Sequence, residues 1–223
     1  MSDLWNPLLL SLRIAGTATA LGLLISAPLA LLMARRRFKG KSLVEGLIVV
    51  PLVMPPTVVG YAIIRLFGTN GWVGYWIHRA FGYSIMFRFE GAVLAAMVVA
   101  LPLLYLPAKA GFASVKREQE DSARLMGANH WQVFWHVSLP LARRGIYSGL
   151  LLAFARALGE FGATIMVFGW QATKLTLPIS IYADYEQGSD QSQQHAMAAV
   201  VALTVISLAL TMAYNRSTAS TQE

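Results

Sequence analysis

Five long apolar blocks, separated by polar stretches, make up most of this chain. They cover about residues 8–34, 43–67, 91–112, 142–168 and 195–214. A helix that crosses the hydrocarbon core of a bilayer needs about 20 mainly apolar residues, and each block meets that length. The pattern therefore predicts an all-α polytopic membrane protein with five transmembrane helices, and it leaves open a sixth or re-entrant segment. We expect residues 1–223 to form a single transmembrane domain.

Prolines divide the second and third blocks. The second contains Pro51, Pro55 and Pro56, and the third is interrupted by Pro102 and Pro107. Adjacent prolines remove two backbone donors, so we expect the second helix to be disrupted at Pro55 and Pro56. Inside a bilayer, such a break is tolerated where protein or a water-filled path satisfies the freed carbonyl groups. Pro55, Pro56 and the following Thr57 therefore form either a structural kink or part of a transport pathway.

The fourth block contains charged residues in the middle of an apolar segment. Arg156, Glu160 and Thr164 are spaced i, i+4, i+8, so they are expected to share one face of a continuous helix. Charges near the centre of a bilayer are costly and are normally paired and turned toward the bundle interior. Arg156 and Glu160 are therefore either a mutually neutralising structural pair or a contact for a transported ion. Gly159 and Gly162 would permit close approach of another helix.

Two other polar stretches connect the blocks. Residues 68–89 are rich in glycine and aromatic residues, a composition typical of a short helix that lies on the membrane surface. Residues 171–194 contain three acidic side chains, and we expect them to form a polar loop.

The polar stretch 118–140 has a pattern of its own. Residues 117–126 are helix formers with acidic side chains near the start, which suits the helix dipole. Gly127 follows where a helix would end in a left-handed residue. Asn129 is then the expected N-cap of a second short helix, with Gln132 closing a capping box. The pattern predicts a helix, a tight glycine turn and another helix.

The second of these helices has a bulky apolar face. Trp131, Phe134 and Trp135 recur at i, i+3, i+4. An ordinary connecting loop and a DNA-binding helix-turn-helix are the competing interpretations. The second is disfavoured because membrane-length segments flank the stretch closely, so we expect no nucleic-acid partner.

Composition and charge support the membrane class. The chain is 56% hydrophobic and 13% charged, and it contains no cysteine. The net charge of +7 comes from basic residues at the ends of the apolar blocks, which indicates membrane orientation. With the stretch 118–140 inside, the N-terminus lies outside and the C-terminus in the cytoplasm. The expected cytoplasmic basic residues are Arg35, Arg36, Arg37, Lys39, Lys41, Lys109, Lys116, Arg117, Arg124, Arg143, Arg144 and Arg216, against Arg65, Arg79, Arg88 and Lys174 outside.

No catalytic or cofactor site can be assembled from the sequence. Gly40-Lys41-Ser42 resembles the end of a phosphate-binding loop, but position 35, where that motif needs glycine, is arginine. The four histidines are scattered without metal-ligand spacing. We therefore expect neither an enzyme nor a cofactor.

The stretch 118–140 resembles the EAA loop of ABC-importer permeases. Glu120-Asp121-Ser122-Ala123, then Gly127, then nine residues to Val137-Ser138-Leu139-Pro140, match that pattern of Glu-Ala-Ala, three residues, Gly, nine residues and Ile-x-Leu-Pro. Asp121, Ser122 and Val137 depart from it. The resemblance implies a coupling loop, at about residues 114–140, that docks into a cytoplasmic ATPase subunit. The residues expected to act there are Glu120, Ala123, Arg124, Gly127, Trp131, Phe134, Leu139 and Pro140.

Over nearly its whole length the chain resembles molybdate ABC-transporter permeases. Stretches that carry this resemblance are residues 34–42, 51–61, 158–165, 177–178 and 181–182. It implies a type I importer permease fold in the inner membrane of a bacterium or archaeon. The implied partners are a second copy of the chain, two cytoplasmic ATP-binding subunits, and a periplasmic or extracellular oxyanion-binding protein. The pathway or gate is expected at Pro55, Pro56, Thr57, Arg156, Glu160 and Thr164.

The sequence leaves three alternatives to a molybdate permease. Tungstate and sulfate permeases are similar in the same places. A secondary transporter would instead use Arg156 and Glu160 as an ion site, but such proteins commonly contain inverted repeats, and none is visible here. A membrane-embedded enzyme is disfavoured for lack of a nucleophile–base pair.

Overall fold

Helices form all the regular structure in the part of the chain that the computed structural model describes, residues 2–170 and 175–219. Three are long and apolar enough to cross a membrane: α1 (Ser2–Arg35), α5 (Phe89–Ser114) and α11 (Asp190–Ala219). Two bent pairs raise that number to five if each counts as one span: α2 (Lys41–Val53) with α3 (Pro56–Phe67), and α8 (Leu139–Leu158) with α9 (Gly162–Phe168). The all-α prediction is confirmed.

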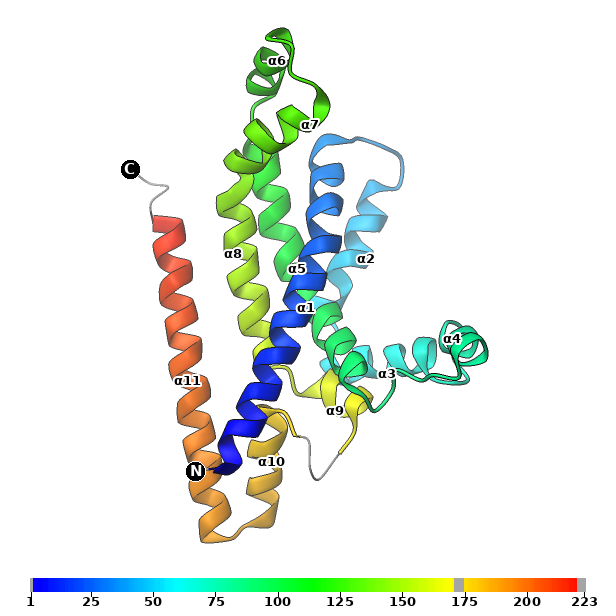
Figure 1. Ribbon diagram of the computed structural model, residues 1–223, viewed down its shortest axis with the longest axis vertical. Coiled ribbons are helices and arrows are strands. Elements are labelled where there is room, and N and C mark those ends of the chain that lie inside the picture. Colours follow the sequence, from blue (N-terminus) through cyan, green and yellow to red (C-terminus); the bar gives the residue numbers. More distant parts are fainter. Residues whose placement is uncertain (1, 171–174, 220–223) are drawn as a thin grey trace.

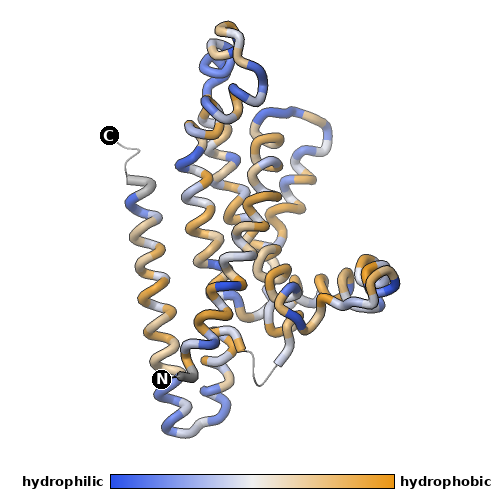
Figure 2. Tube along the Cα trace, in the orientation of Figure 1, coloured by the Kyte–Doolittle hydropathy of each residue, from blue (hydrophilic) through white to orange (hydrophobic). Residues whose placement is uncertain are grey.

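The long helices run side by side along the long axis of the molecule (Figure 1). Apolar residues fill the middle of this bundle, and polar residues gather at its two ends (Figure 2). Helices α1, α5 and α8 share one core in which small side chains such as Ala18, Ala96 and Ala153 are completely buried. Small residues let helix backbones approach closely, which is how helices associate within a bilayer.

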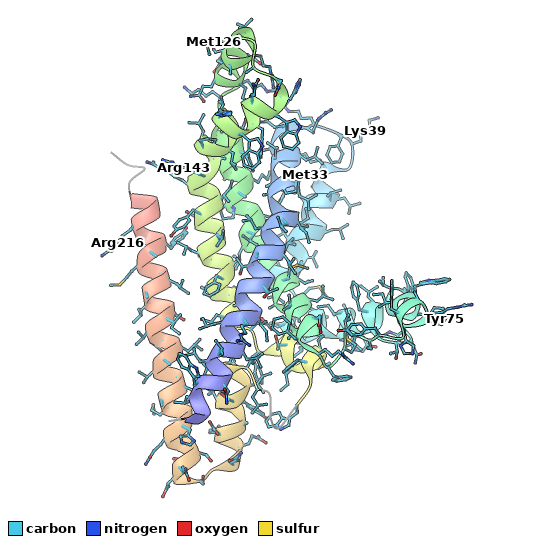
Figure 3. The ribbon with its side chains drawn as sticks, viewed as in Figure 1. Met33, Lys39, Tyr75, Met126, Arg143 and Arg216 are labelled. Atoms are coloured by element: carbon cyan, nitrogen blue, oxygen red, sulfur yellow. The ribbon has the colours of Figure 1, made fainter. Side chains whose placement is uncertain are left out.

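The second apolar block breaks at Pro55, as predicted. The chain turns by 118° between α2 and α3, so α3 leaves the bundle sideways (Figure 1). The short helix expected after it is α4 (Gly74–Phe81), which carries Tyr75 at the far side of this projection (Figure 3). A salt bridge of 2.6 Å between Lys109 Nζ and Glu45 Oε1 ties α5 to α2.

The third apolar block forms one span, as expected, and its two prolines do not break the helix. Helix α5 continues through both Pro102 and Pro107. Each proline removes a single backbone donor, and the two losses are five residues apart. Neighbouring helices and local adjustments satisfy isolated losses of this kind within a bilayer.

The fourth apolar block is not the continuous helix that the spacing of its polar residues suggested. Helix α8 ends at Leu158, and α9 starts at Gly162 after a bend of 59°. Thr164 therefore does not share a straight helix face with Arg156 and Glu160. The expectation of one face failed because hydrophobic periodicity cannot register a bend at Gly159, a residue with low helix propensity.

The stretch 171–194 contains a helix, which corrects the expectation of a loop. Helix α10 (Leu177–Gln187) packs its Leu177 and Ile179 into the interior and ends at Gly188 in a left-handed conformation. The backbone N–H of Leu177 donates to Ser11 Oγ at 2.8 Å, so α10 is fixed to the N-terminal half of α1. Lys174, expected among the external basic residues, lies outside the described residues.

Candidate functional site

The loop between α5 and α8 has the predicted glycine turn. Helix α6 (Arg117–Leu125) is followed by Gly127 with a φ of +89°. The N–H of Ala128 donates to the carbonyl of Ala123 at 3.1 Å, and the N–H of Gly127 donates to the carbonyl of Arg124 at 2.9 Å. These two bonds define a Schellman motif, in which the left-handed residue is usually glycine. The turn thus satisfies the last carbonyl groups of α6 and reverses the chain.

The second helix of the loop begins with the predicted capping box. Asn129 Oδ1 accepts the N–H of Gln132 at 2.9 Å, and Gln132 Oε1 accepts the N–H of Asn129 at 2.8 Å. Helix α7 (His130–Val133) then passes through a π-helical turn, η1 (Phe134–Ser138), directly into α8. The second helix is therefore the end of a membrane-spanning helix, so its orientation is fixed by the bundle.

The predicted aromatic face of this helix is present. Phe134 contacts Trp131 and Trp135 edge to face, with ring centroids 6.2 and 5.3 Å apart. Trp131 and Trp135 are exposed, and Phe134 packs toward the core. Together with Pro28 and Leu31 of α1, Trp131 and Phe134 line an apolar groove of about 390 Å³.

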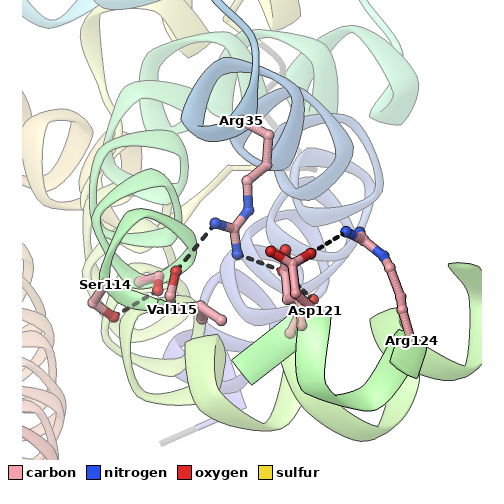
Figure 4. A network of polar contacts seen from close by, with 8 residues as sticks. Arg35, Ser114, Val115, Asp121 and Arg124 are labelled. Carbon is pink, nitrogen blue, oxygen red and sulfur yellow. Dashed lines mark hydrogen bonds and ion pairs between the residues drawn. The ribbon is translucent and has the colours of Figure 1, made fainter. Parts of the chain in front are cut away.

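Glu120 lies inside the molecule. It is 7% exposed, and its Oε1 accepts a hydrogen bond from Arg35 Nη2 at 2.5 Å and another from Ser138 Oγ at 2.6 Å. Arg35 Nη1 also donates to the carbonyl of Val115 at 3.1 Å (Figure 4). Among the predicted coupling residues, Glu120 is thus one that holds the loop to its own bundle.

The outward side of the loop carries other residues. At its tip, Met126 is 83% exposed, and Leu125 beside it is exposed as well (Figure 3). Arg124 forms an exposed ion pair with Asp121 at 2.8 Å. Ala123 is buried, Leu139 is half-buried, and Pro140 is exposed at the start of α8. Leu125 and Met126 were missed from the sequence, although two large apolar residues at the end of a polar helix are the pattern that could have marked them.

The two helix bends lie against each other. A Cβ built on Gly162 would lie only 2.9 Å from Cβ of Pro56 and 3.4 Å from the backbone N of Thr57. Only glycine therefore fits at position 162 without displacing α3. The predicted pathway segment at Pro55, Pro56 and Thr57 is thus brought next to the break between α8 and α9, with Pro55 and Thr57 exposed.

Arg156 and Glu160 form the predicted ion pair, with Nη1 and Oε2 2.5 Å apart. Glu160 is 3% exposed, while 30% of the Arg156 side chain is accessible. Glu160 Oε1 also accepts the N–H of Ala163 at 2.8 Å, which satisfies a donor in the first turn of α9. The carboxylate thus both neutralises Arg156 and stabilises the bend. Thr164, predicted beside them, is buried in α9.

A polar groove at the opposite end of the bundle was not anticipated. It has a volume of about 790 Å³ between α1, α10 and α11, and Arg13, Asp184 and His195 are among its lining residues. Nearby, Tyr182 packs against Phe161 and donates a hydrogen bond to Glu186 at 3.0 Å. That hydrogen bond raises the pKa of the Tyr182 hydroxyl above its ordinary value.

The bent helices and the loop between α5 and α8 belong to a membrane permease of the binding-protein-dependent class, as sequence comparison shows. Residues 26–219 match the binding-protein-dependent transport system inner membrane component family, and the chain belongs to it. The molybdenum transport system permease protein of Haemophilus influenzae is 37% identical, over 90% of this chain and 89% of its own length. The corresponding protein of Escherichia coli (strain K12) is 37% identical over 93% and 89%. A sulfate transport system permease protein of Synechocystis is 36% identical over 84% and 71%.

Solved structures share the fold. An amino acid ABC transporter crystallised with histidines superimposes with a TM-score of 0.61 and 22% identity, over 96% of this chain and 93% of that chain. A bacterial alginate ABC transporter, crystallised in complex with an alginate pentasaccharide-bound periplasmic protein, superimposes with a TM-score of 0.70 and 17% identity, over 95% and 76%. The chain therefore has the type I importer permease fold, and it is a multi-pass membrane protein.

Proposed function

We propose that this chain is the permease subunit of an ATP-driven importer of a tetrahedral oxyanion, with molybdate as the substrate. The observation that carries the proposal is the 37% identity to two molybdenum transport permeases over at least 90% of this chain. A permease of this class needs only to alternate between two access states, which a separate ATPase biases. ATP hydrolysis is accordingly assigned to a partner subunit.

The loop between α5 and α8 is the proposed docking element for that ATPase. Its exposed tip at Leu125 and Met126 offers apolar surface, and Arg124 and Trp131 are accessible beside it. Apolar anchors with a polar surround are typical of protein interfaces. The Schellman turn at Gly127 fixes the direction of α6 relative to the helix that continues into the membrane.

The two helix bends are the proposed gate. Breaks in membrane helices are tolerated where they are buried in protein or line an aqueous cavity. Pro55 and Thr57 are exposed in a single chain, so a second copy facing them would enclose the pathway. In this arrangement Glu160, with Arg156, holds the bend of α8 and α9 and does not contact the anion directly.

The coupling loop is proposed to lie in the cytoplasm, with the N-terminus outside. Basic residues support this orientation, because Lys39, Arg143 and Arg216 lie toward the end of the bundle that carries the loop (Figure 3). The polar groove lined by Arg13 and His195 would then face outward, toward an oxyanion-binding protein.

Sulfate is the second candidate substrate, since the Synechocystis sulfate permease is 36% identical over 84% of this chain. The test is to purify the chain with its ATPase and reconstitute it in vesicles with binding protein loaded with molybdate, tungstate or sulfate. We expect molybdate-loaded protein to stimulate ATP hydrolysis and oxyanion uptake most strongly. Stimulation only by sulfate-loaded binding protein would make sulfate the substrate in place of molybdate. Absence of any ATPase partner would refute the proposal that the chain belongs to an ATP-driven importer.

A further inference from the structure

Arg35, the last residue of α1, connects that helix to both ends of the coupling loop. Its Nη1 donates to the carbonyl of Val115, just before α6, at 3.1 Å. Its Nη2 donates to Glu120 Oε1 at 2.5 Å, and the same oxygen accepts Ser138 Oγ at 2.6 Å, where the loop re-enters the bundle. One guanidinium and one carboxylate thus join three segments that are far apart in the sequence (Figure 4).

Membrane orientation alone does not account for this arginine. Arg36, Arg37 and Lys39 follow it directly, and all three are exposed at the membrane boundary, where they supply the orienting charge. The Arg35 side chain is only 20% accessible. Removing an arginine and a glutamate from water is costly unless the two are paired with good geometry. The planar fork of arginine reaches two acceptors at once, which the single ammonium of lysine cannot do in the same way.

The ion pair links parts of the molecule that have different roles under the proposed function, on which this inference rests. Glu120 belongs to the loop that the ATPase would move, whereas α1 packs along α5 and α8 through the whole bundle. We propose that Arg35 is a positioning residue that makes α1 follow the coupling loop when the ATPase displaces it. Without the pair, the loop would move while α1 stays behind.

A purely structural pair makes a different prediction, and a double variant separates the two. Replacing one partner leaves an uncompensated charge in a poorly hydrated site, whereas replacing both by apolar residues is often neutral for stability. We therefore compare Arg35→Met, Glu120→Met and the double variant, each reconstituted with its ATPase and loaded binding protein. The single variants should be recovered in lower amounts, and the double variant should recover in thermal stability and in ATPase association.

The decisive readout is the ratio of receptor-stimulated to basal ATP hydrolysis. If Arg35 transmits movement, the double variant should still bind its ATPase, yet lose about fivefold or more of the stimulation measured relative to its own basal rate. Arg35→Lys, which keeps the charge but can satisfy fewer acceptors, should lie between the double variant and the natural protein. Arg37→Met is the matched control, because it removes the same charge two positions after Arg35. The Arg37 side chain is exposed, and no ion pair is found for it among the described residues. A double variant with normal stimulation would show that the pair is only structural and would overturn the proposal.

A distance measurement tests whether α1 follows the coupling loop even if the double variant does not assemble with its ATPase. The chain has no cysteine, so spin labels at Arg36→Cys and Gln119→Cys mark the end of α1 and helix α6 alone. We expect the distance between the labels to stay constant between nucleotide-free and ATP-bound complexes, while distances from α6 to the outer end of the bundle change. Separation of the two labels on ATP binding would overturn the proposal. A natural complex that no loaded binding protein stimulates would refute the proposed function instead.

Discussion

Replacing Gly127 by valine tests the coupling loop most directly. Gly127 has a φ of +89°, in the left-handed region where an L-residue is strained. A Cβ at this position would meet nothing within 4 Å, so the effect that we expect comes from the backbone conformation. The change therefore acts on the turn itself and alters no membrane-spanning helix.

The expected size of the effect of Gly127→Val follows from the same backbone geometry. The left-handed conformation costs alanine about 1 kcal/mol and a β-branched residue about 3 kcal/mol. Because every 1.4 kcal/mol is a factor of ten, valine shifts the equilibrium away from the closed turn by about a hundredfold. The carbonyl groups of Ala123 and Arg124 then lose their partners, and α6 loses its direction. Asparagine, which tolerates this conformation better, should retain most of the function.

The assay measures recovery of the ATPase with the permease and receptor-stimulated hydrolysis in the same preparation. We expect Gly127→Val to insert into the membrane normally and to lose stimulation, with Gly127→Ala intermediate. Gly82→Val is the matched control, because Gly82 ends α4 with a φ of +61° and also has nothing within 4 Å of an added Cβ. If Gly127→Val keeps both ATPase recovery and stimulation at normal levels, this loop is not the coupling element and the proposed function fails.

Three further predictions concern the helix bends. Glu160→Ala should lower the free energy of unfolding by about 2–4 kcal/mol, because it leaves Arg156 without its partner and removes a cap of α9. The double variant Arg156→Ala/Glu160→Ala should be more stable than Glu160→Ala in thermal unfolding in detergent. A double variant that is less stable would contradict the pairing. Gly162→Ala should lower the free energy of unfolding by about 1–3 kcal/mol and reduce oxyanion uptake, because its Cβ would lie 2.9 Å from that of Pro56. An unchanged melting temperature and unchanged uptake would contradict the close contact. Thr57→Cys, the sole cysteine in such a variant, should react with a polar thiol reagent in one nucleotide state only, and equal protection in every state would reduce this segment to a structural kink.

Local patterns were enough to predict the turn of the coupling loop. Gly127, Asn129 and Gln132 act through bonds to residues no more than four positions away, and each has a conformational preference that few other residues share. The five apolar blocks were predictable for a similar reason, since bilayer thickness sets their length. The all-helical fold therefore follows from the sequence almost directly.

Contacts between distant segments could not be predicted in this way. Arg35 and Glu120 are 85 positions apart, and each had a sufficient local explanation, as a membrane-orienting charge and as a residue of the docking surface. The bend at Gly159 was missed because an i, i+4 spacing is satisfied by the ion pair of Arg156 and Glu160 even where the helix ends between them. Helix α10 was missed because the hydrophobic residues that it buries are few and contact other helices.

Helix α1 is long enough to connect the two ends of the bundle. Its 34 residues give a length of about 50 Å, with the coupling loop attached at one end and the polar groove of Arg13 near the other. Ala18, close to its midpoint, is completely buried, as are Ala15 and Ala30 on either side of it. A tilt of about 5° around that point would move the two ends by about 2 Å in opposite directions. Under the proposed function, α1 tilting as a rigid helix would therefore carry a displacement at the loop between α5 and α8 to the polar groove at the opposite end of the bundle.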